Sequence, residues 1–103
     1  MSIGMKMMIS RYKFKLGDTA PRFICGKYKY DVKIVGRYFA CGEPRYLILC
    51  EKSGISLNII IDRMCNKVEH FDYDDTYSRS NCTHVSESEL MSPNKRNGGF
   101  EFL

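Results

Sequence analysis

Residues 27–36 read KYKYDVKIVG, and this stretch gives the clearest indication of the fold. Aromatic and apolar side chains occupy its even positions up to residue 34, while lysine or aspartate occupies its odd positions. A period of two is the repeat of a β-strand, whose successive side chains point to opposite faces of a sheet. The pattern predicts a strand with one strongly basic face and with Tyr28 and Tyr30 in the core. At Val35 and Gly36 the alternation ends, which predicts a bulge or a bend.

Stretches on both sides of residues 27–36 predict further strands. Residues 11–16 alternate strictly, with Tyr12, Phe14 and Leu16 on one side. Residues 46–50 form a continuous apolar run that suits a central strand, and residues 55–61 again place large apolar side chains at every second position. Short turns that contain glycine separate these stretches, which is typical of an antiparallel meander.

The last third of the sequence is more polar. Residues 71–81 are acidic and without a period, which predicts a loop. Residues 83–85 predict a last short strand, after which Ser86 and Glu89 have the spacing of a capping box at the start of a helix. We therefore expect a mostly β fold, either a small curled antiparallel sheet or a barrel of about five strands, with one short helical turn.

Length and composition predict one domain. The chain has 103 residues, of which 44% are hydrophobic and 27% are charged, as in ordinary globular proteins. We expect a frayed N-terminal segment at residues 1–10, a single β-rich domain at residues 11–91, and a flexible tail with an aromatic end at residues 92–103. The first apolar stretch is interrupted by Lys6 and is too short for a signal peptide or a membrane span.

Five cysteines at irregular spacing, with no Cys-x-x-Cys pair, favour reduced thiols. A free cysteine in an apolar run usually packs as a small buried hydrophobic residue, and Cys25 and Cys50 lie in such runs. Together with the short first apolar stretch, the cysteines predict a cytoplasmic protein that does not enter a membrane.

The sequence carries no catalytic or metal-binding motif. Cys65 with His70 is the nearest approach to a metal pair, and the acids between Glu69 and Asp75 lack the spacing of a calcium loop. No phosphate-binding glycine loop or nucleophile elbow is present, although a cysteine and a histidine could still meet in space. We expect no enzyme, no cofactor, and neither catalytic nor metal-binding residues.

Charge is distributed unevenly along the chain. Residues 1–63 hold 12 Lys and Arg against 5 Asp and Glu, whereas residues 64–91 hold 2 against 6. A basic body favours an anionic partner, either an acidic protein surface or a nucleic acid. The candidate binding residues are basic or aromatic and lie on the basic strand and its continuation, just before the apolar run at residues 46–50, in the acidic loop and in the tail: Lys27, Lys29, Lys33, Arg37, Tyr38, Arg45, Tyr73, Tyr77, Phe100 and Phe102.

Leu16-Gly17-Asp18 after the first strand, the curved meander, and residues 85–90 near the end resemble SH3-like or KOW-type small β-barrels. In its size and its richness in lysine, isoleucine and tyrosine, the chain also resembles small bacteriophage accessory proteins. The second resemblance implies a non-catalytic protein that binds and inhibits a host protein in the host cytoplasm. The alternative is a nucleic-acid-binding barrel that uses the basic strand face. The sequence leaves the oligomeric state open.

Overall fold

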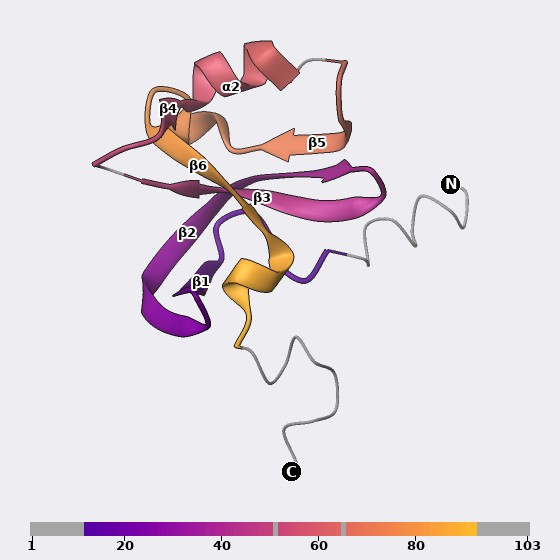
Figure 1. The fold of residues 1–103 in the computed structure, drawn as a ribbon. Helices are drawn as coiled ribbons and strands as arrows, with labels where there is room; N and C mark the ends of the chain where they lie inside the picture. Colours follow the sequence, from indigo (N-terminus) through magenta and orange to yellow (C-terminus); the bar gives the residue numbers. More distant parts are fainter. Residues whose placement is uncertain (1–11, 51, 65, 93–103) are drawn as a thin grey trace.

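The structure is a computed structural model in which residues 12–50, 52–64 and 66–92 are described (Figure 1). It confirms the mostly β class, with a curled antiparallel sheet, one α-helix and a short helical turn near the end of the described chain. The elements in chain order are β1 (Thr19–Ile24), β2 (Lys27–Ala40), β3 (Glu43–Leu49), β4 (Ile55–Ser56), α2 (Leu57–Met64), β5 (Glu69–Tyr73), η1 (Asp75–Tyr77), β6 (Asn81–Ser86) and η2 (Glu87–Leu90).

The long strand β2 organises the sheet. Its first half pairs with β1 up to Lys33. Its second half, from Ile34 to Ala40, pairs with β3 along one edge and with β5 along the other. The strand order is β1-β2-β3-β6-β4, with β5 beside β2, and these strands do not close into a barrel. The curled sheet is therefore the correct one of the two predicted architectures.

Both hairpins of β2 close with a Cys-Gly turn. Cys25 and Gly26 connect β1 to β2, and Cys41 and Gly42 connect β2 to β3. All four residues have positive φ angles, between 53° and 78°. Positive φ at both central residues defines the type I′ turn, whose twist matches that of the paired strands. Cys25 is therefore exposed in a turn, and the expectation that it packs in an apolar run is wrong.

The predicted bulge in β2 is confirmed. The register with β3 shifts between Ile34 and Gly36, so one extra residue changes which face each later side chain occupies. A Cβ atom at Gly36 would lie 2.7 Å from Cδ1 of Leu47, so a larger residue here would force the buried Leu47 side chain to shift.

Each face of the sheet carries its own core. One cluster contains Ile34 and Tyr46 and is covered by Tyr12, Phe14 and Leu16. The other is built from Val35, Tyr38, Leu47, Leu57, Ile60, Met64 and Cys82. Because of the bulge, even-numbered residues of β2 change sides, so Ile34 lies in one core and Tyr38 in the other.

The strand predicted at residues 11–16 is absent from the described part of this segment. Residues 12–18 are irregular, because the edge of β2 that they could join is already paired with β1 and β5. The alternation survives in the packing, since Tyr12, Phe14 and Leu16 are half-buried while Lys13 and Lys15 are exposed. The prediction was right about the buried side and wrong about the strand.

The strand predicted at residues 55–61 is also wrong beyond β4. The chain turns into α2, whose buried residues Leu57, Ile60 and Met64 are spaced by three and four. This spacing is the repeat of one helix face. Ile59 has 46% of its surface exposed, although a strand would have placed it on the same face as Leu57.

The loop predicted at residues 71–81 contains regular structure. Its first residues belong to β5, which pairs with β2, and η1 follows directly. Asp74 caps η1 by accepting a hydrogen bond from the Thr76 amide at 3.0 Å. Beyond it, β6 extends the predicted last strand by a few residues, and the Ser86 amide donates to Oε1 of Glu89 at 2.9 Å as the capping pattern predicts.

Candidate protein-binding surface

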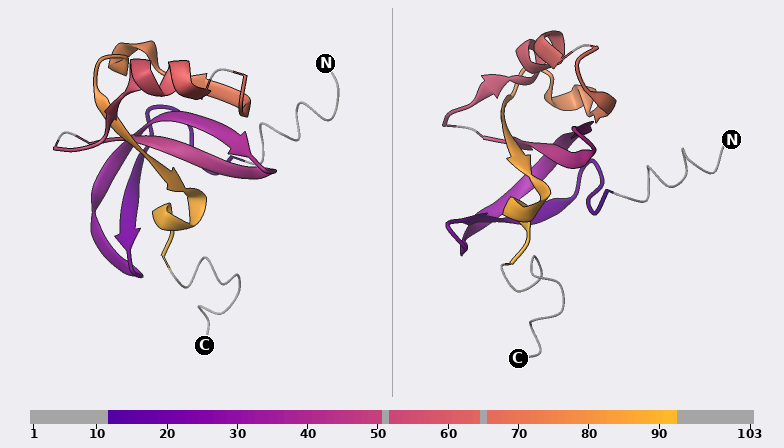
Figure 2. Two further views of the ribbon diagram at one scale, coloured as in Figure 1. Left: turned by 45° about the horizontal axis from the view of Figure 1, so that its top comes forward. Right: turned by 45° about the vertical axis from the view of Figure 1, so that its right-hand side comes forward.

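The hairpin of β1 and β2 projects from one end of the molecule, opposite α2 (Figure 2). Three large apolar side chains are exposed on it: 39% of Ile24, 56% of Tyr28 and 51% of Tyr30. The prediction that both tyrosines fill the core is therefore wrong. The register with β1 shifts by one residue between them, so Tyr28 is opposite Phe23 and Tyr30 is opposite Arg22. Along β2 the buried cluster reaches only to Val32, so the hairpin extends beyond its own core.

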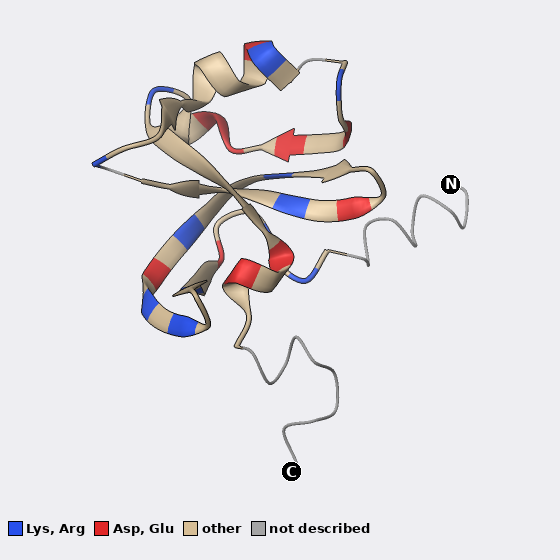
Figure 3. Cartoon of the chain, viewed as in Figure 1, with Lys and Arg blue, Asp and Glu red and all other residues tan. Residues whose placement is uncertain are grey.

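Basic residues alternate with these tyrosines along the projecting half of β2 (Figure 3). Lys27 and Lys29 are exposed. Lys33 is partly buried, and its ammonium nitrogen lies 6.0 Å from the ring centroid of Tyr77. Both faces of the hairpin tip are exposed, so Lys27, Tyr28, Lys29 and Tyr30 are all available to a partner.

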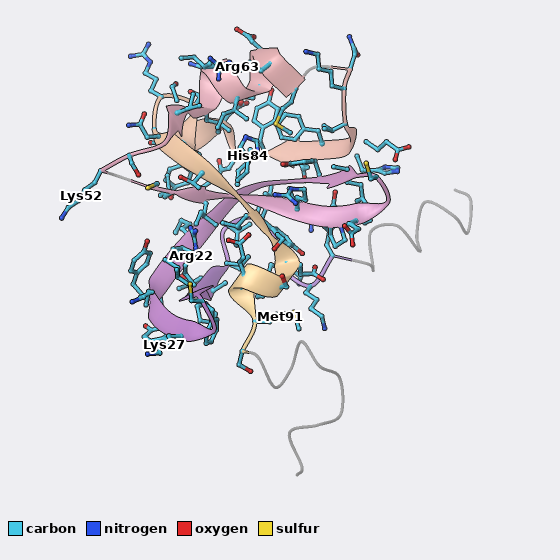
Figure 4. The ribbon with its side chains drawn as sticks, viewed as in Figure 1. Arg22, Lys27, Lys52, Arg63, His84 and Met91 are labelled. Atoms are coloured by element: carbon cyan, nitrogen blue, oxygen red, sulfur yellow. The ribbon has the colours of Figure 1, made fainter. Side chains whose placement is uncertain are left out.

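A groove opens beside the hairpin, where β2 and β3 stop pairing. It encloses about 540 Å³, within the usual range of roughly 300–1,000 Å³ for binding clefts. Val32, Ile48 and Leu49 supply apolar lining. The remaining lining residues are polar, aromatic or charged: Arg22, Tyr30, Asp31, Lys33, Cys50, Lys52 and Ser53. Figure 4 labels Arg22 and Lys52, the two cations that come from outside β2.

Arg22 reaches this groove from β1. It is directly opposite Tyr30 in the antiparallel register, so the two side chains lie on the same face. One guanidinium nitrogen lies 3.7 Å from Oε2 of Glu89 in η2. The Nε atom is buried without a hydrogen-bond partner among the described residues.

Arg22 and Lys52 were not among the candidates from the sequence. A two-residue turn at Gly26 would by itself place Arg22 opposite Lys29. A register shift between Arg22 and Phe23 places Arg22 opposite Tyr30 instead, so the turn could not have identified it. Nothing in the sequence around Lys52 indicates that its loop returns to the groove.

Two cysteines near the groove have different environments. Hydrogen bonds from Ser53 and Thr83 lower the pKa of Cys50, whose sulfur lies 3.1 Å from Oγ of Ser53. Burial raises the pKa of Cys82 to about 11. Cys50 is the thiol of this pair that favours the reactive thiolate.

Several predicted binding residues have internal roles instead. Arg37 lies 4.5 Å from the ring centroid of Tyr12, donates to the carbonyl of Phe14 at 3.1 Å and lies 3.7 Å from Asp72. Tyr38 is buried, and its hydroxyl lies 2.8 Å from Nδ1 of His84. Both residues follow the bulge, so the structure separates them from the lysines before it.

The other candidates are scattered. Arg45 is partly buried on β3. Burial of His84 lowers the pKa of that histidine, and the nearby charge of Arg45 lowers it further. Tyr73 is exposed on β5, and Tyr77 packs against the core that contains α2. Phe100 and Phe102 lie outside the described residues. So do the predicted N-terminal segment at residues 1–10 and the predicted tail at residues 92–103, of which only Ser92 is described.

Within the described ranges, no three His, Cys, Asp or Glu side chains are grouped so that they could hold a metal ion. None of the described helices has the length and apolar character that a membrane crossing requires. Searches against family models, curated proteins and solved structures found no match to this chain. The candidate surface therefore stands on its own geometry.

Proposed function

We propose that this chain is a non-catalytic recognition domain that binds another protein through the projecting β1–β2 hairpin and the groove beside it. The observation that carries the proposal is the exposure of Tyr28 and Tyr30, each about half exposed, on a hairpin that reaches beyond the core. Aromatic side chains with basic neighbours are the usual anchors of protein interfaces, because a ring buries a large area with little loss of conformational entropy.

Inhibition of a host protein extends this proposal. In the phage-type role that the sequence resembles, a rigid hairpin would block its target by covering a working surface. The type I′ turn at Cys25 and Gly26 supports such a role, since a tight turn presents the tip in one conformation before binding.

A nucleic-acid-binding role is the second candidate. Tyr30 and Arg22 share one face, and Lys33 and Lys52 line the same groove. A ring beside cations could stack on a base while the cations contact phosphates. The Asp31 carboxylate in the lining would repel phosphates and carboxylates alike, so it does not decide between this role and an acidic protein partner.

The test is a capture experiment in nuclease-treated lysate of the host cell. Wild-type chain is compared with a Tyr28→Ala and Tyr30→Ala double variant, and bound proteins are identified by mass spectrometry. We expect a discrete partner that the double variant loses, because truncation of two anchors removes the centre of the interface.

An Ile59→Ala variant is the matched control, since Ile59 is similarly exposed but lies on α2, at the other end of the molecule. A partner retained by the double variant and lost with Ile59→Ala would place the interface on α2 and refute the proposal. If only nucleic acid is recovered from untreated lysate, and high salt abolishes its binding, the nucleic-acid-binding role is favoured.

A further inference from the structure

We infer that the groove binds an acidic peptide segment of the partner in extended form, as an added strand on the open edge of β2. This inference rests on the proposed function and names the kind of partner segment that the same surface would take. Three observations support it: the open backbone edge, the charges around the groove and the apolar lining.

The backbone of β2 has an open edge beside the groove. Ile34 directs its polar groups toward the β1 side, since its amide donates to Asp18 at 2.9 Å and its carbonyl accepts from Gly17 at 2.8 Å. Polar groups alternate in direction along a strand, so the amide and carbonyl of Asp31 point away from β1. Among the described strands, β3 pairs with β2 only from Ile34 onward. An extended peptide could therefore pair with Asp31.

The charges around this edge favour an acidic peptide. Arg22, Lys33 and Lys52 line the groove, and Asp31 is the single acidic residue in its lining. Lys29 is exposed on the adjoining part of β2. Cations on three separate segments surround one short edge, so a peptide with several carboxylates would match them and a basic peptide would be repelled.

The backbone and the lining favour a peptide over a nucleic acid or a second copy of the chain. An open strand edge presents an amide and a carbonyl together, and an extended peptide satisfies both, whereas a phosphate backbone accepts hydrogen bonds but donates none. Val32, Ile48 and Leu49 provide apolar contacts for the side chains of an added strand. A second copy would bring its own lysines against these lysines, which opposes edge-to-edge pairing.

The test uses a fluorescent eight-residue peptide of alternating glutamate and valine, with binding followed by fluorescence polarisation. We expect saturable binding that fails when lysine replaces glutamate. A series of peptides, each with one N-methylated amide, then examines the backbone. Strand addition predicts that methylation weakens binding at every second position, because only alternate amides face β2. Uniform sensitivity, no sensitivity or no binding would overturn the inference.

Charge-reversal variants locate the site. Lys33→Glu with Lys52→Glu should weaken binding by roughly tenfold or more, because like charges then face the peptide. The matched control is Lys67→Glu with Arg79→Glu, which changes net charge equally at exposed positions outside the groove. Equal loss in both double variants would mean that only net charge matters, and it would overturn the inference.

These outcomes are separable from failure of the proposed function. Lys52 is not part of the hairpin, so the Lys52→Glu change alone tests the groove. If the captured partner requires Tyr28 and Tyr30 but is indifferent to Lys52→Glu and to competition by the peptide, the hairpin is the site and strand addition is wrong. Saturable binding of oligothymidine in place of the peptide would overturn both the proposed function and the strand-addition inference. Self-association through the hairpin, measured by analytical sedimentation, would also overturn both.

Discussion

Cys41 and Gly42 hold φ angles of 53° and 78°, and Cys25 and Gly26 repeat the same pair. Cysteine has no local means of stabilising a left-handed backbone, whereas asparagine adopts that conformation readily. The positions of both turns could be predicted from their glycines. Their type could not, because cysteine is not a residue that indicates a type I′ turn.

The stability of the fold should depend on how well the residue at position 41 tolerates a positive φ angle. We expect Cys41→Asn to raise the free energy of unfolding by about 0.5–1 kcal/mol, because it relieves part of the left-handed strain. Cys41→Val should lower it, since a β-branched side chain tolerates positive φ poorly. The midpoint of urea denaturation measures both changes, provided that the slope of the unfolding free energy against urea concentration stays the same. If neither variant shifts the midpoint, the turn assignment is wrong.

Tyr12 makes stability depend on alkaline pH. Burial raises its pKa from 10.0 to about 12, an effect that the nearby Arg37 partly opposes, and its hydroxyl donates to the His70 carbonyl at 3.0 Å. A raised pKa favours the protonated phenol in the folded state, so its stabilising contribution is complete below pH 10 and is lost as the pH rises through 12. Urea midpoints between about pH 9 and pH 12 should fall less steeply for Tyr12→Phe than for wild type. Parallel curves would contradict this role.

At the scale of elements, periodicity identified the buried side chains better than the backbone that carries them. Residues 12–16 keep their alternation without forming a strand, because β1 and β5 already occupy the edge of β2. Residues 55–61 fit both periods, since isoleucine or leucine occupies five of the seven positions from Ile55 to Ile61. Tertiary packing decides between them in favour of α2.

The helical period of α2 predicts unequal costs for neighbouring isoleucines. Ile60→Ala should lower the free energy of unfolding by roughly 2–5 kcal/mol, because Ile60 is 2% exposed within the core. Ile59→Ala should cost well under 1 kcal/mol, because Ile59 is 46% exposed. Chemical denaturation compares the two variants. The reverse order of costs would indicate that residues 55–61 form a strand after all.

At the scale of the whole molecule, the fold places the predicted basic strand where it projects. The sequence predicted the strand and its lysines. It could not predict that the core ends at Val32. This limit depends on how far along β2 the segment that contains Phe14 and the helix η2 cover the sheet. Arg37 and Tyr38 were predicted as surface residues because the effect of the bulge on their faces is visible only once β5 and α2 are in place.

Charge is also arranged at this scale. The acidic residues of β5 and η1 lie near the end that carries α2, away from the projecting hairpin (Figure 3). Figure 3 also shows acidic segments in η2, nearer the hairpin, and a basic segment on α2. Attraction of an acidic partner before contact would therefore come from the lysines of the hairpin itself. The proposed interface therefore combines three features: an aromatic tip, an open strand edge and surrounding basic residues.

The most direct test of that interface is hydrogen exchange of backbone amides, measured for the free chain and for its complex with the captured partner. We expect slower exchange at residues 27–33, in the hairpin strand, and at Cys50, Lys52 and Ser53, which line the far wall of the groove. Slower exchange at α2 and β5, with the hairpin unchanged, would contradict it.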